Sequence, residues 1–459
     1  MNWIEFSRTF RCITICLTIY VICGSSCSKY LDKKSDNSLA IPKTLQDFQS
    51  LLDYAVRMNF SEPILGEIAA DNYYLLANDF QSLNVSYRDN YIWKNVAEWD
   101  ANWVSPYTAI STSNLVLDNL EKVKNGDKLL FNSIKGSALF FRGHLHFNVV
   151  QDYAKAYDNS TASEDIGIVL KLTADINDPS KRVSLKECYL QIIEDLKNAA
   201  SLLPFTTSIS TRPTKAAAFA ELARVYLCMS DFVQSGLYAD SCLQIRDELI
   251  DYNTLDGSTK YPIASFNEET IFFATSLGAP PLKPPTCIVD STLYQSYSNN
   301  DLRKHLFFGD NGNNTYSFRG NYAGTTNGGS SVCFTGIATD EIYLIRAECY
   351  ARNNDTKRAL IDINTLLRKR WLQNTFIDFD LDDSEKVLMV ILNERRKELI
   401  FRNRRWSDLK RLNKVSKFAI TLERKFENDT YSLPPNDLRY ELLIPNSVIS
   451  ISGIEQNKR

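Results

Sequence analysis

Residues 216–226 read AAAFAELARVY, and this alanine-rich stretch decides the fold class. A short break near Ser230 and Asp231 follows it, and a second run with helical spacing, ADSCL, occupies residues 239–243. Small side chains that face larger ones let two antiparallel helices approach closely, as in one tetratricopeptide unit. The stretch therefore predicts a helix hairpin.

Similar patterns extend in both directions along the chain. Apolar residues recur at three- and four-residue steps in several runs between about residues 39 and 246, with short polar breaks between the runs. The same periodicity returns at 341–348 and 359–367, and a further helix is expected at about 384–403. No strict 34-residue repeat emerges. We therefore predict an all-α, mostly helical protein built from divergent, tetratricopeptide-like helix hairpins.

The section from 250 to 335 has a different texture. It contains Pro262, two Pro-Pro pairs at 280–281 and 284–285, and an Asn/Gly-rich run from Gly309 to Gly329. Proline and glycine at this density predict loops and turns with only short strand-like pieces. Long ordered loops on a helical frame are places where binding surfaces are built. We expect a loop-rich insert here.

The first thirty residues predict export. Arg8 and Arg11 precede an apolar run from Cys12 to Cys23, and small residues then lead to Cys27. The run is shorter than the about 20 residues that a membrane-spanning helix needs, and its flanks fit a signal peptide. A plain cleaved signal or an uncleaved anchor are the alternatives. We predict a lipoprotein signal at 1–26 and acylation (palmitate) at Cys27, which would tether the body to a membrane.

The composition limits what the body can do. The net charge of -3 gives no global attraction to nucleic acid, and 44% hydrophobic residues are ample for a core. We predict one unit over 27–459, with helical parts at 27–249 and 336–459 around the insert at 250–335. The later cysteines are irregularly spaced, which favours buried free thiols. His144 and His146, two apart on a helix, cannot bind one ion together, so no metal and no cofactor is predicted.

Several motifs in the correct order resemble the SusD/RagB family. They are DEIYLIRAECYAR at 340–352, NERRKEL at 393–399, RWSDLKR at 405–411, Ile444-Pro445 and Gln456-Asn457. Members of this family are surface lipoproteins that capture nutrients beside a TonB-dependent outer-membrane transporter. One departure is Phe401-Arg402-Asn403, where the family usually has phenylalanine, glutamate and glycine. Arg402 therefore adds charge where an acid is usual.

The resemblance implies a function in uptake. The chain would sit on the outer membrane, exposed at the cell surface, bind an oligosaccharide or peptide, and act as the lid of a SusC-like TonB-dependent transporter. It would not be an enzyme, because the sequence lacks a G-x-S-x-G elbow, a metal-spaced His/Glu set and a phosphate loop. A surface glycoside hydrolase remains an alternative because carboxylate pairs cannot be recognised from sequence. A tetratricopeptide-type scaffold that binds only proteins is the other.

The charged signatures are interpreted as structural. Glu394, Glu398 and Arg402 lie four apart and can form ion pairs worth a few tenths of a kcal/mol each when exposed. Arg405 and Arg411 are interpreted as part of a salt-bridged helical surface, not as a nucleic-acid patch, given the acidic total.

The ligand surface is predicted from aromatic residues. Three tryptophans fall within eleven residues, from Trp93 to Trp103, and aromatic faces stack on the C–H faces of sugars or on peptide side chains. Trp103 starts a helical stripe and is expected in the core. For Trp93 and Trp99, burial in the core is the alternative to ligand contact. The predicted ligand-binding residues are Asp71, Asn72, Tyr73, Trp93, Trp99 and Tyr294, with Tyr297 and Tyr316 as weaker candidates.

Overall fold

The computed structural model describes residues 42–60, 62–94, 98–124, 126–324, 330–426 and 429–459. The predicted signal peptide and the lipid acceptor Cys27 lie outside the described residues, so both stay predictions. Residues Thr44–Arg459 cluster as one unit by their contacts. The description below concerns that unit.

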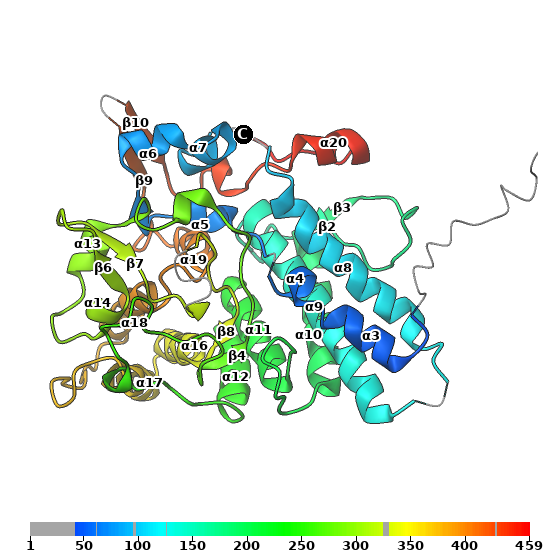
Figure 1. Cartoon of the computed structure of the whole chain (residues 1–459), viewed down its shortest axis with the longest axis horizontal. Helices are drawn as coiled ribbons and strands as arrows, with labels where there is room; N and C mark the ends of the chain where they lie inside the picture. The colour runs from blue at the N-terminus through cyan, green and yellow to red at the C-terminus, as the bar shows by residue number, and fades with distance from the viewer. Residues whose placement is uncertain (1–41, 61, 95–97, 125, 325–329, 427–428) are drawn as a thin grey trace, which may run out of the picture. The chain divides into compact units, whose positions relative to one another are not determined.

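Consecutive helices pack side by side through the middle of the chain. Each of α8, α9, α10, α11 and α12 contacts the next, and α12 then contacts α16, which pairs with α17 (Figure 1). Their bounds are Ala101–Leu120, Lys128–Tyr153, Leu185–Leu202, Lys215–Cys228, Phe232–Leu243, Thr339–Arg352 and Thr356–Arg368. This arrangement confirms the mostly helical, hairpin-based fold class.

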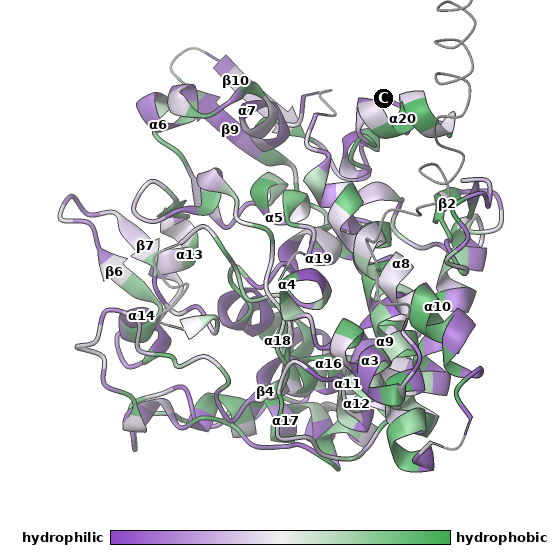
Figure 2. Cartoon of the chain, turned by 45° about the vertical axis from the view of Figure 1, so that its right-hand side comes forward, coloured by the Kyte–Doolittle hydropathy of each residue, from purple (hydrophilic) through white to green (hydrophobic). Residues whose placement is uncertain are grey.

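Local sequence explains why the hairpins form. Ser184 caps α10 in a capping box with Glu187, and Pro204 stands just beyond its last turn. Thr214 caps α11, whose alanines Ala216 to Ala218 are fully buried. In Figure 2, α10 carries hydrophobic residues on one side and hydrophilic residues on the other. The alanines let α11 lie close to α10 and α12, as the sequence predicted.

Further described α-helices lie outside this stack. They are α3 (Leu45–Leu52), α4 (Ala55–Met58), α5 (Leu65–Ala69), α6 (Ala77–Ser82), α7 (Val85–Tyr91), α13 (Ser291–Gln295), α14 (Arg303–Leu306), α18 (Ser384–Glu398), α19 (Arg405–Leu412) and α20 (Asn446–Ser452). The helix expected at 384–403 ends at Glu398, because Phe401 and Asn403 have φ angles of 55° and 57°. Asparagine tolerates this left-handed conformation, for which glycine is the default. No described helix has the length and apolar character needed to cross a membrane.

The insert at 250–335 contains strands of only two or three residues, as the sequence predicted. Three of its strands join β1 (Tyr73–Tyr74) in an antiparallel sheet of order β1-β5-β7-β6. The partners are β5 (Ile288–Val289), β6 (Phe308–Asp310) and β7 (Tyr316–Phe318). The remaining strands form two-stranded pairs: β2 (Ile166–Val169) with β3 (Arg182–Ser184), β4 (Thr270–Phe272) with β8 (Ile337–Ala338), and β9 (Leu422–Phe426) with β10 (Asp429–Leu433).

The charged signatures form ion pairs, as the sequence predicted, and most of these pairs are buried. Arg303 is fully buried and pairs with Asp301 at 2.7 Å, Glu394 at 2.6 Å and Glu398 at 2.8 Å. Arg370, also fully buried, joins Glu398 at 2.7 Å. Arginine can be buried in this way because each guanidinium donor meets a carboxylate or carbonyl oxygen.

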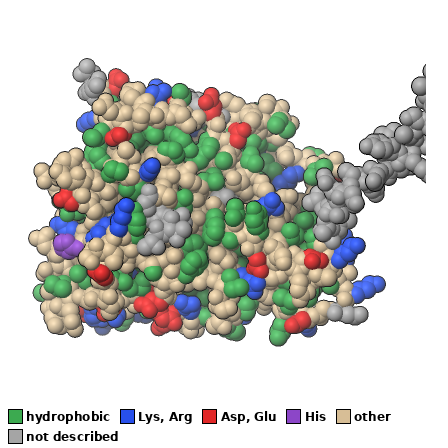
Figure 3. Space-filling view, viewed as in Figure 1, with side chains coloured by type: hydrophobic (Ala, Val, Ile, Leu, Met, Phe, Trp, Pro, Cys, Tyr) green, Lys and Arg blue, Asp and Glu red, His purple; other side chains and the backbone are tan. Residues whose placement is uncertain are grey.

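Other family-signature residues also form buried ion pairs. Arg411 Nη1 donates to Glu348 at 2.6 Å, and Arg395 Nε donates to Asp408 at 2.9 Å. Arg402, the departure from the family pattern, pairs with Asp340 at 2.9 Å. Positive and negative side chains are interspersed on the face that Figure 3 presents. Inside the protein, buried ion pairs join α19 to α16 and to α18.

Candidate ligand-binding site

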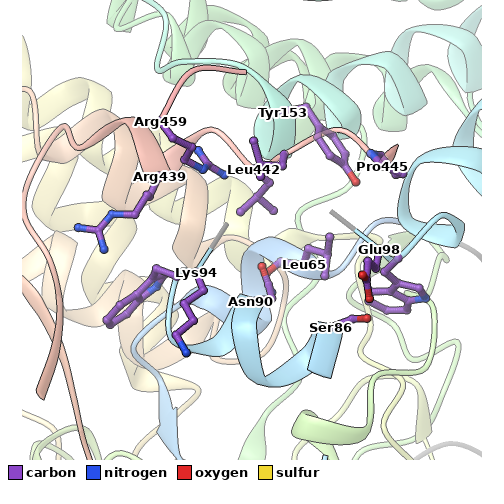
Figure 4. A pocket seen from close by; sticks show the side chains of 13 residues that line it. Leu65, Ser86, Asn90, Lys94, Glu98, Tyr153, Arg439, Leu442, Pro445 and Arg459 are labelled. Carbon is purple, nitrogen blue, oxygen red and sulfur yellow. The ribbon is translucent and has the colours of Figure 1, made fainter. Parts of the chain in front are cut away.

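A narrow surface hollow of about 20 Å³, or about 500 Å³ when the open space at its mouth is counted, lies where the predicted tryptophans meet the end of the chain (Figure 4). We call it the tryptophan hollow. One wall comes from α5, α7 and the segment after α7, and the other from the C-terminal segment, with Tyr153 of α9 between them. The lining residues are Leu65, Ser86, Asn90, Trp93, Lys94, Glu98, Trp99, Tyr153, Arg439, Leu442, Leu443, Pro445 and Arg459.

Local contacts fix the wall that follows α7. Asn84 caps α7 by accepting the backbone N–H of Tyr87, and the Asn90 amide donates to Leu65 O at 3.1 Å. Trp93 then takes a left-handed conformation, with φ of 59°, that turns the chain away from the helix. The indole Nε1–H of Trp93 donates to Ala69 O at 3.0 Å. These bonds hold α5 and α7 together beside the hollow.

Trp93 belongs mainly to the protein interior. Its side chain is 4% exposed, and the Arg424 guanidinium lies 5.3 Å from the ring centroid. The same guanidinium lies 4.2 Å from the ring centroid of Tyr91 and donates to Tyr73 O at 3.0 Å. Cation–π contacts of this kind occupy the aromatic face. In this conformation Trp93 therefore shapes the hollow without offering an open face.

Trp99 is placed differently. It is half-buried and meets the edge of Tyr87, with ring centroids 5.0 Å apart and an interplanar angle of 70°. Lys94 and Glu98 beside it are exposed. A partly open indole with charged groups on either side can stack against a ligand and fix its orientation.

The opposite wall is held by the last residues of the chain. Arg459 Nη1 donates to Leu438 O at 3.0 Å and to Glu441 O at 2.5 Å, and burial lowers the pKa of Arg459 to about 10. The Asn457 amide donates to Tyr153 O at 2.8 Å and to Leu442 O at 2.7 Å. The hollow therefore joins segments more than 300 residues apart in sequence.

The side chains of three predicted ligand-binding residues form hydrogen bonds within the protein instead. Asp71 receives two hydrogen bonds from Arg405, at 2.6 and 2.8 Å. Burial alone would raise the pKa of Asp71. The positive charges of Arg405 and Arg396 outweigh this effect and lower the pKa. Asn72 donates to Glu67 Oε1 at 3.2 Å, and the Tyr73 hydroxyl donates to Ile68 O at 3.0 Å. Asn72 and Tyr73 are also almost fully buried. The structure thus places these side chains behind the surface.

Tyr294 lies apart from the hollow, on α13. Its ring stacks on Tyr316 of β7, with centroids 3.7 Å apart and an interplanar angle of 13°, and Lys304 Nζ lies 5.3 Å from its centroid. Both tyrosines are half-buried. Tyr297 is buried and donates to Lys397 O at 2.8 Å. The structure therefore separates the predicted aromatics into the hollow and a second, smaller aromatic surface.

Other sequence-based interpretations can be placed in the same way. Trp103 is 5% exposed and packs on Tyr153 with centroids 4.9 Å apart, which confirms its expected core position. His144 is fully buried between Glu62 and Glu221. Within the described residues, no group of three or more His, Cys, Asp or Glu side chains could hold a metal ion.

The C-terminal wall was missed from sequence. Arg439, Leu442, Pro445 and Arg459 carry no local pattern that connects them with a tryptophan cluster far upstream. The Ile444-Pro445 and Gln456-Asn457 motifs indicated a closing segment but not the surface that it completes. The position of this wall is fixed by the long-range hydrogen bonds of Asn457, which the sequence alone does not reveal.

Comparisons with known proteins agree with this fold. A family described as starch-binding and associating with the outer membrane matches residues 29–227, and the SusD family matches residues 291–441. A SusD-like protein P2 of Formosa agariphila is 22% identical over 412 residues, which cover 76% of this chain and 80% of that protein.

Solved structures extend the similarity to nearly the whole chain. A SusD superfamily protein of Bacteroides thetaiotaomicron has a TM-score of 0.74 at 22% identity, covering 91% of this chain and 100% of its own. A putative sugar-binding protein of Bacteroides vulgatus has a TM-score of 0.73 at 18% identity, covering 91% and 98%. With the two family matches spanning both the N-terminal and the C-terminal helical regions, this chain belongs to the SusD family.

Proposed function

We propose that this chain binds a nutrient, an oligosaccharide or a peptide, at the cell surface and delivers it to a TonB-dependent outer-membrane transporter as its lid. The observation that carries the proposal is the tryptophan hollow on a SusD fold. The family description as starch-binding and associating with the outer membrane supports an oligosaccharide as the ligand. Lipid attachment at Cys27 would keep the protein at that membrane.

Binding, without bond cleavage, fits the chemistry of the hollow. Trp99 supplies a partly open aromatic surface, and Ser86, Lys94, Glu98 and Arg439 supply polar groups around it. Sugar rings present C–H faces to aromatic side chains and hydroxyls to polar ones, so a wall of this composition suits them. Tyr294 with Tyr316 is proposed as a second, separate ligand contact. Trp93 is proposed to act through the shape of the hollow.

The test compares two tryptophan variants. Replacing Trp99 with alanine should weaken ligand binding about 5–150-fold, or about 1–3 kcal/mol, because a well-placed aromatic contact is lost. The melting temperature should stay close to that of the wild type. A glycan array followed by calorimetric titration of the best glycan, with a peptide library in parallel, measures the effect.

Trp371→Ala is the matched control, because Trp371 is another half-buried tryptophan and does not line the hollow. It should bind the same glycan or peptide as tightly as the wild type. If the Trp99 variant bound the ligand as tightly as the wild type, the tryptophan hollow would not be the ligand-binding site. Catalytic turnover of the bound glycan or peptide would replace the binding function with the hydrolase alternative.

A further inference from the structure

A second and larger concavity runs along α8, on a surface that the proposed ligand site does not use. We call it the α8 groove; it encloses about 1590 Å³, including its open mouth. Its walls are α8, the segment between β2 and β3, and α20. The lining residues are Arg57, Trp103, Val104, Tyr107, Thr108, Ser111, Thr112, Asn114, Leu115, Val169, Lys171, Thr173, Ala174, Asp175, Ile176, Ser180, Val448, Ile451, Ser452 and Ile454.

The floor of the groove is one face of a helix. Val104, Thr108, Ser111 and Leu115 recur at four-, three- and four-residue steps, so they lie in a row on α8. At 1.5 Å per residue the row is about 16 Å long. Val104 is 47% exposed and Leu115 is partly exposed, so this strip, apolar at both ends with two hydroxyl side chains between them, is accessible in the part of the chain that the structure describes. The strip is long enough for a short peptide segment.

Two isoleucines stand at the sides of this strip. Ile176, between β2 and β3, is 93% exposed, and Ile451, in α20, is 87% exposed. None of the residues of α20 is buried, although Figure 2 shows hydrophobic residues along it. A contiguous apolar surface of this kind on a folded protein marks an interaction site. Both isoleucines would lose most of their exposed surface against an occupant of the groove.

The polar groups of the groove argue against a glycan as the occupant. The Tyr107 hydroxyl donates to Val169 O at 2.7 Å, and the Thr108 hydroxyl donates to Val104 O at 2.8 Å. The Asn114 amide donates to Lys171 O at 2.9 Å and to Thr173 O at 3.1 Å. These donors are directed at the chain itself, so a polyhydroxyl ligand would find few of them to use. Apolar side chains are the better match.

The charges of the groove argue against a lipid surface. The lining contains two basic residues, Arg57 and Lys171, and one acidic residue, Asp175, and Lys171 Nζ donates to Asp178 O at 2.5 Å. Binding to anionic headgroups uses clusters of four or more basic residues, which this lining does not contain. A concave floor is also a poor fit to a flat membrane. A largely uncharged protein segment fits both the shape and the charge.

The position of the groove relative to the start of the folded unit favours a partner in the same membrane. The unit begins at Thr44, the N-cap of α3, and α3 packs against α8. About 17 residues separate Thr44 from Cys27, so an anchor at Cys27 would hold this part of the molecule within about 60 Å of the bilayer. A transporter embedded in that bilayer is therefore within reach of α8.

We propose that the α8 groove is a docking surface for the transporter and receives apolar side chains from one of its segments outside the bilayer. The assignment rests on the proposed function, because it takes the transporter from there. Beyond the proposed function, it names the α8 groove as the surface that contacts the transporter and an apolar segment of the transporter as the part that binds. The tryptophan hollow keeps its separate role in ligand binding.

The test is co-purification of the tagged full-length chain with its co-expressed TonB-dependent transporter. The double variant Ile176→Asp with Ile451→Asp places charge on both sides of the groove and should lower transporter recovery at least tenfold. Because both side chains are exposed, its melting temperature and its glycan binding should match the wild type. Ile377→Asp is the matched control, since Ile377 is 86% exposed and does not line the groove; its recovery should be unchanged.

A photo-crosslinking residue provides an independent readout. Placed at Ser111, an exposed floor position, it should form an adduct with the transporter, whereas at Ser201, exposed on α10, it should not. Full recovery of the transporter with the double variant and no adduct at Ser111 would overturn the assignment of the groove alone. Failure of the wild-type chain to recover any transporter would overturn the proposed function as well. Loss of glycan binding in the double variant would instead make the groove a ligand site.

Discussion

Substitution of single charged residues is expected to destabilise this protein strongly, because the charged side chains are buried with their partners. Arg303 contacts three carboxylates and Arg370 contacts Glu398 and Glu269, all deep in the molecule. Removing one partner of such a group leaves the others buried without compensation. The effect of a substitution is therefore set by the partners that remain.

Arg303→Met should lower the free energy of unfolding by about 3–5 kcal/mol, because Asp301, Glu394 and Glu398 would lose their shared cation. Urea titration followed by circular dichroism measures the change. Arg358→Met is the control, since Arg358 pairs with Asp355 at the surface, where its side chain is 62% exposed. Its unfolding midpoint should match the wild type. Equal stability of the Arg303 variant and the wild type would contradict the buried-network interpretation.

His144 should make the protein sensitive to alkaline pH. Burial alone would lower the pKa of His144, but Glu62, 2.6 Å away, and Glu221, 3.1 Å away, reverse this effect and raise the pKa to about 9. Since the folded-state pKa lies above the unfolded value of about 6.5, the stabilisation is fully present below pH 6.5 and is lost as the pH rises through 9.

Urea midpoints at pH 6, 8 and 10 measure this dependence. The wild type should lose more stability between pH 8 and 10 than His144→Gln, which has no imidazole to deprotonate. The variant is less stable at pH 6, because Glu62 and Glu221 lose their cation. Parallel pH profiles for the two proteins would show that His144 is neutral in the folded state.

At the scale of elements, close helix packing depends on alanine in α11. Ala216, Ala217, Ala218 and Ala220 are fully buried, and α11 contacts α10 on one side and α12 on the other. A larger side chain at such a position forces the helices apart or strains rotamers. The close approach of these helices therefore limits the size of the side chain at each of these alanine positions.

Ala217→Leu should lower the free energy of unfolding by about 1–3 kcal/mol through overpacking. Asn198→Leu, at an exposed position of α10, adds a leucine without a packing conflict and should change stability little. Thermal melts of both variants, followed by helical dichroism, measure the difference. A more stable Ala217 variant would indicate unfilled space between the helices.

Sequence patterns predicted the positions of the helices better than the partners of their buried side chains. The periodicity that predicted the helices reflects burial of one face, which any helix pair requires, so α11, α12, α16 and α17 appeared near their predicted positions. Burial of whole ion pairs leaves no such periodicity, because it depends on partners about 100 residues apart, such as Arg303 and Glu394. For the same reason the sequence placed Trp93 and Trp99 together but could not tell that Arg424 covers only the first.

At the scale of the whole molecule, the proposed anchoring at the outer membrane depends on one thiol. Cys27→Ala should release the protein into the soluble fraction and abolish incorporation of labelled palmitate, because a lipid chain is the proposed anchor. Cys23→Ala is the control and should remain in the membrane fraction with its label. Retention of the Cys27 variant would exclude lipid anchoring at that residue, and release of the Cys23 variant would move the acceptor to Cys23.

The buried network also has a consequence for how the protein is made. Arg303 and Arg370 precede α18 in sequence, and both depend on Glu398 at its end. A chain cut short before α18 would therefore retain cations that have no place in a closed interior. Such a fragment should stay open to envelope proteases, whereas the finished chain can close. Burial of these two cations therefore requires the chain as far as Glu398, and we expect fragments that end before α18 to be digested faster than chains that include it.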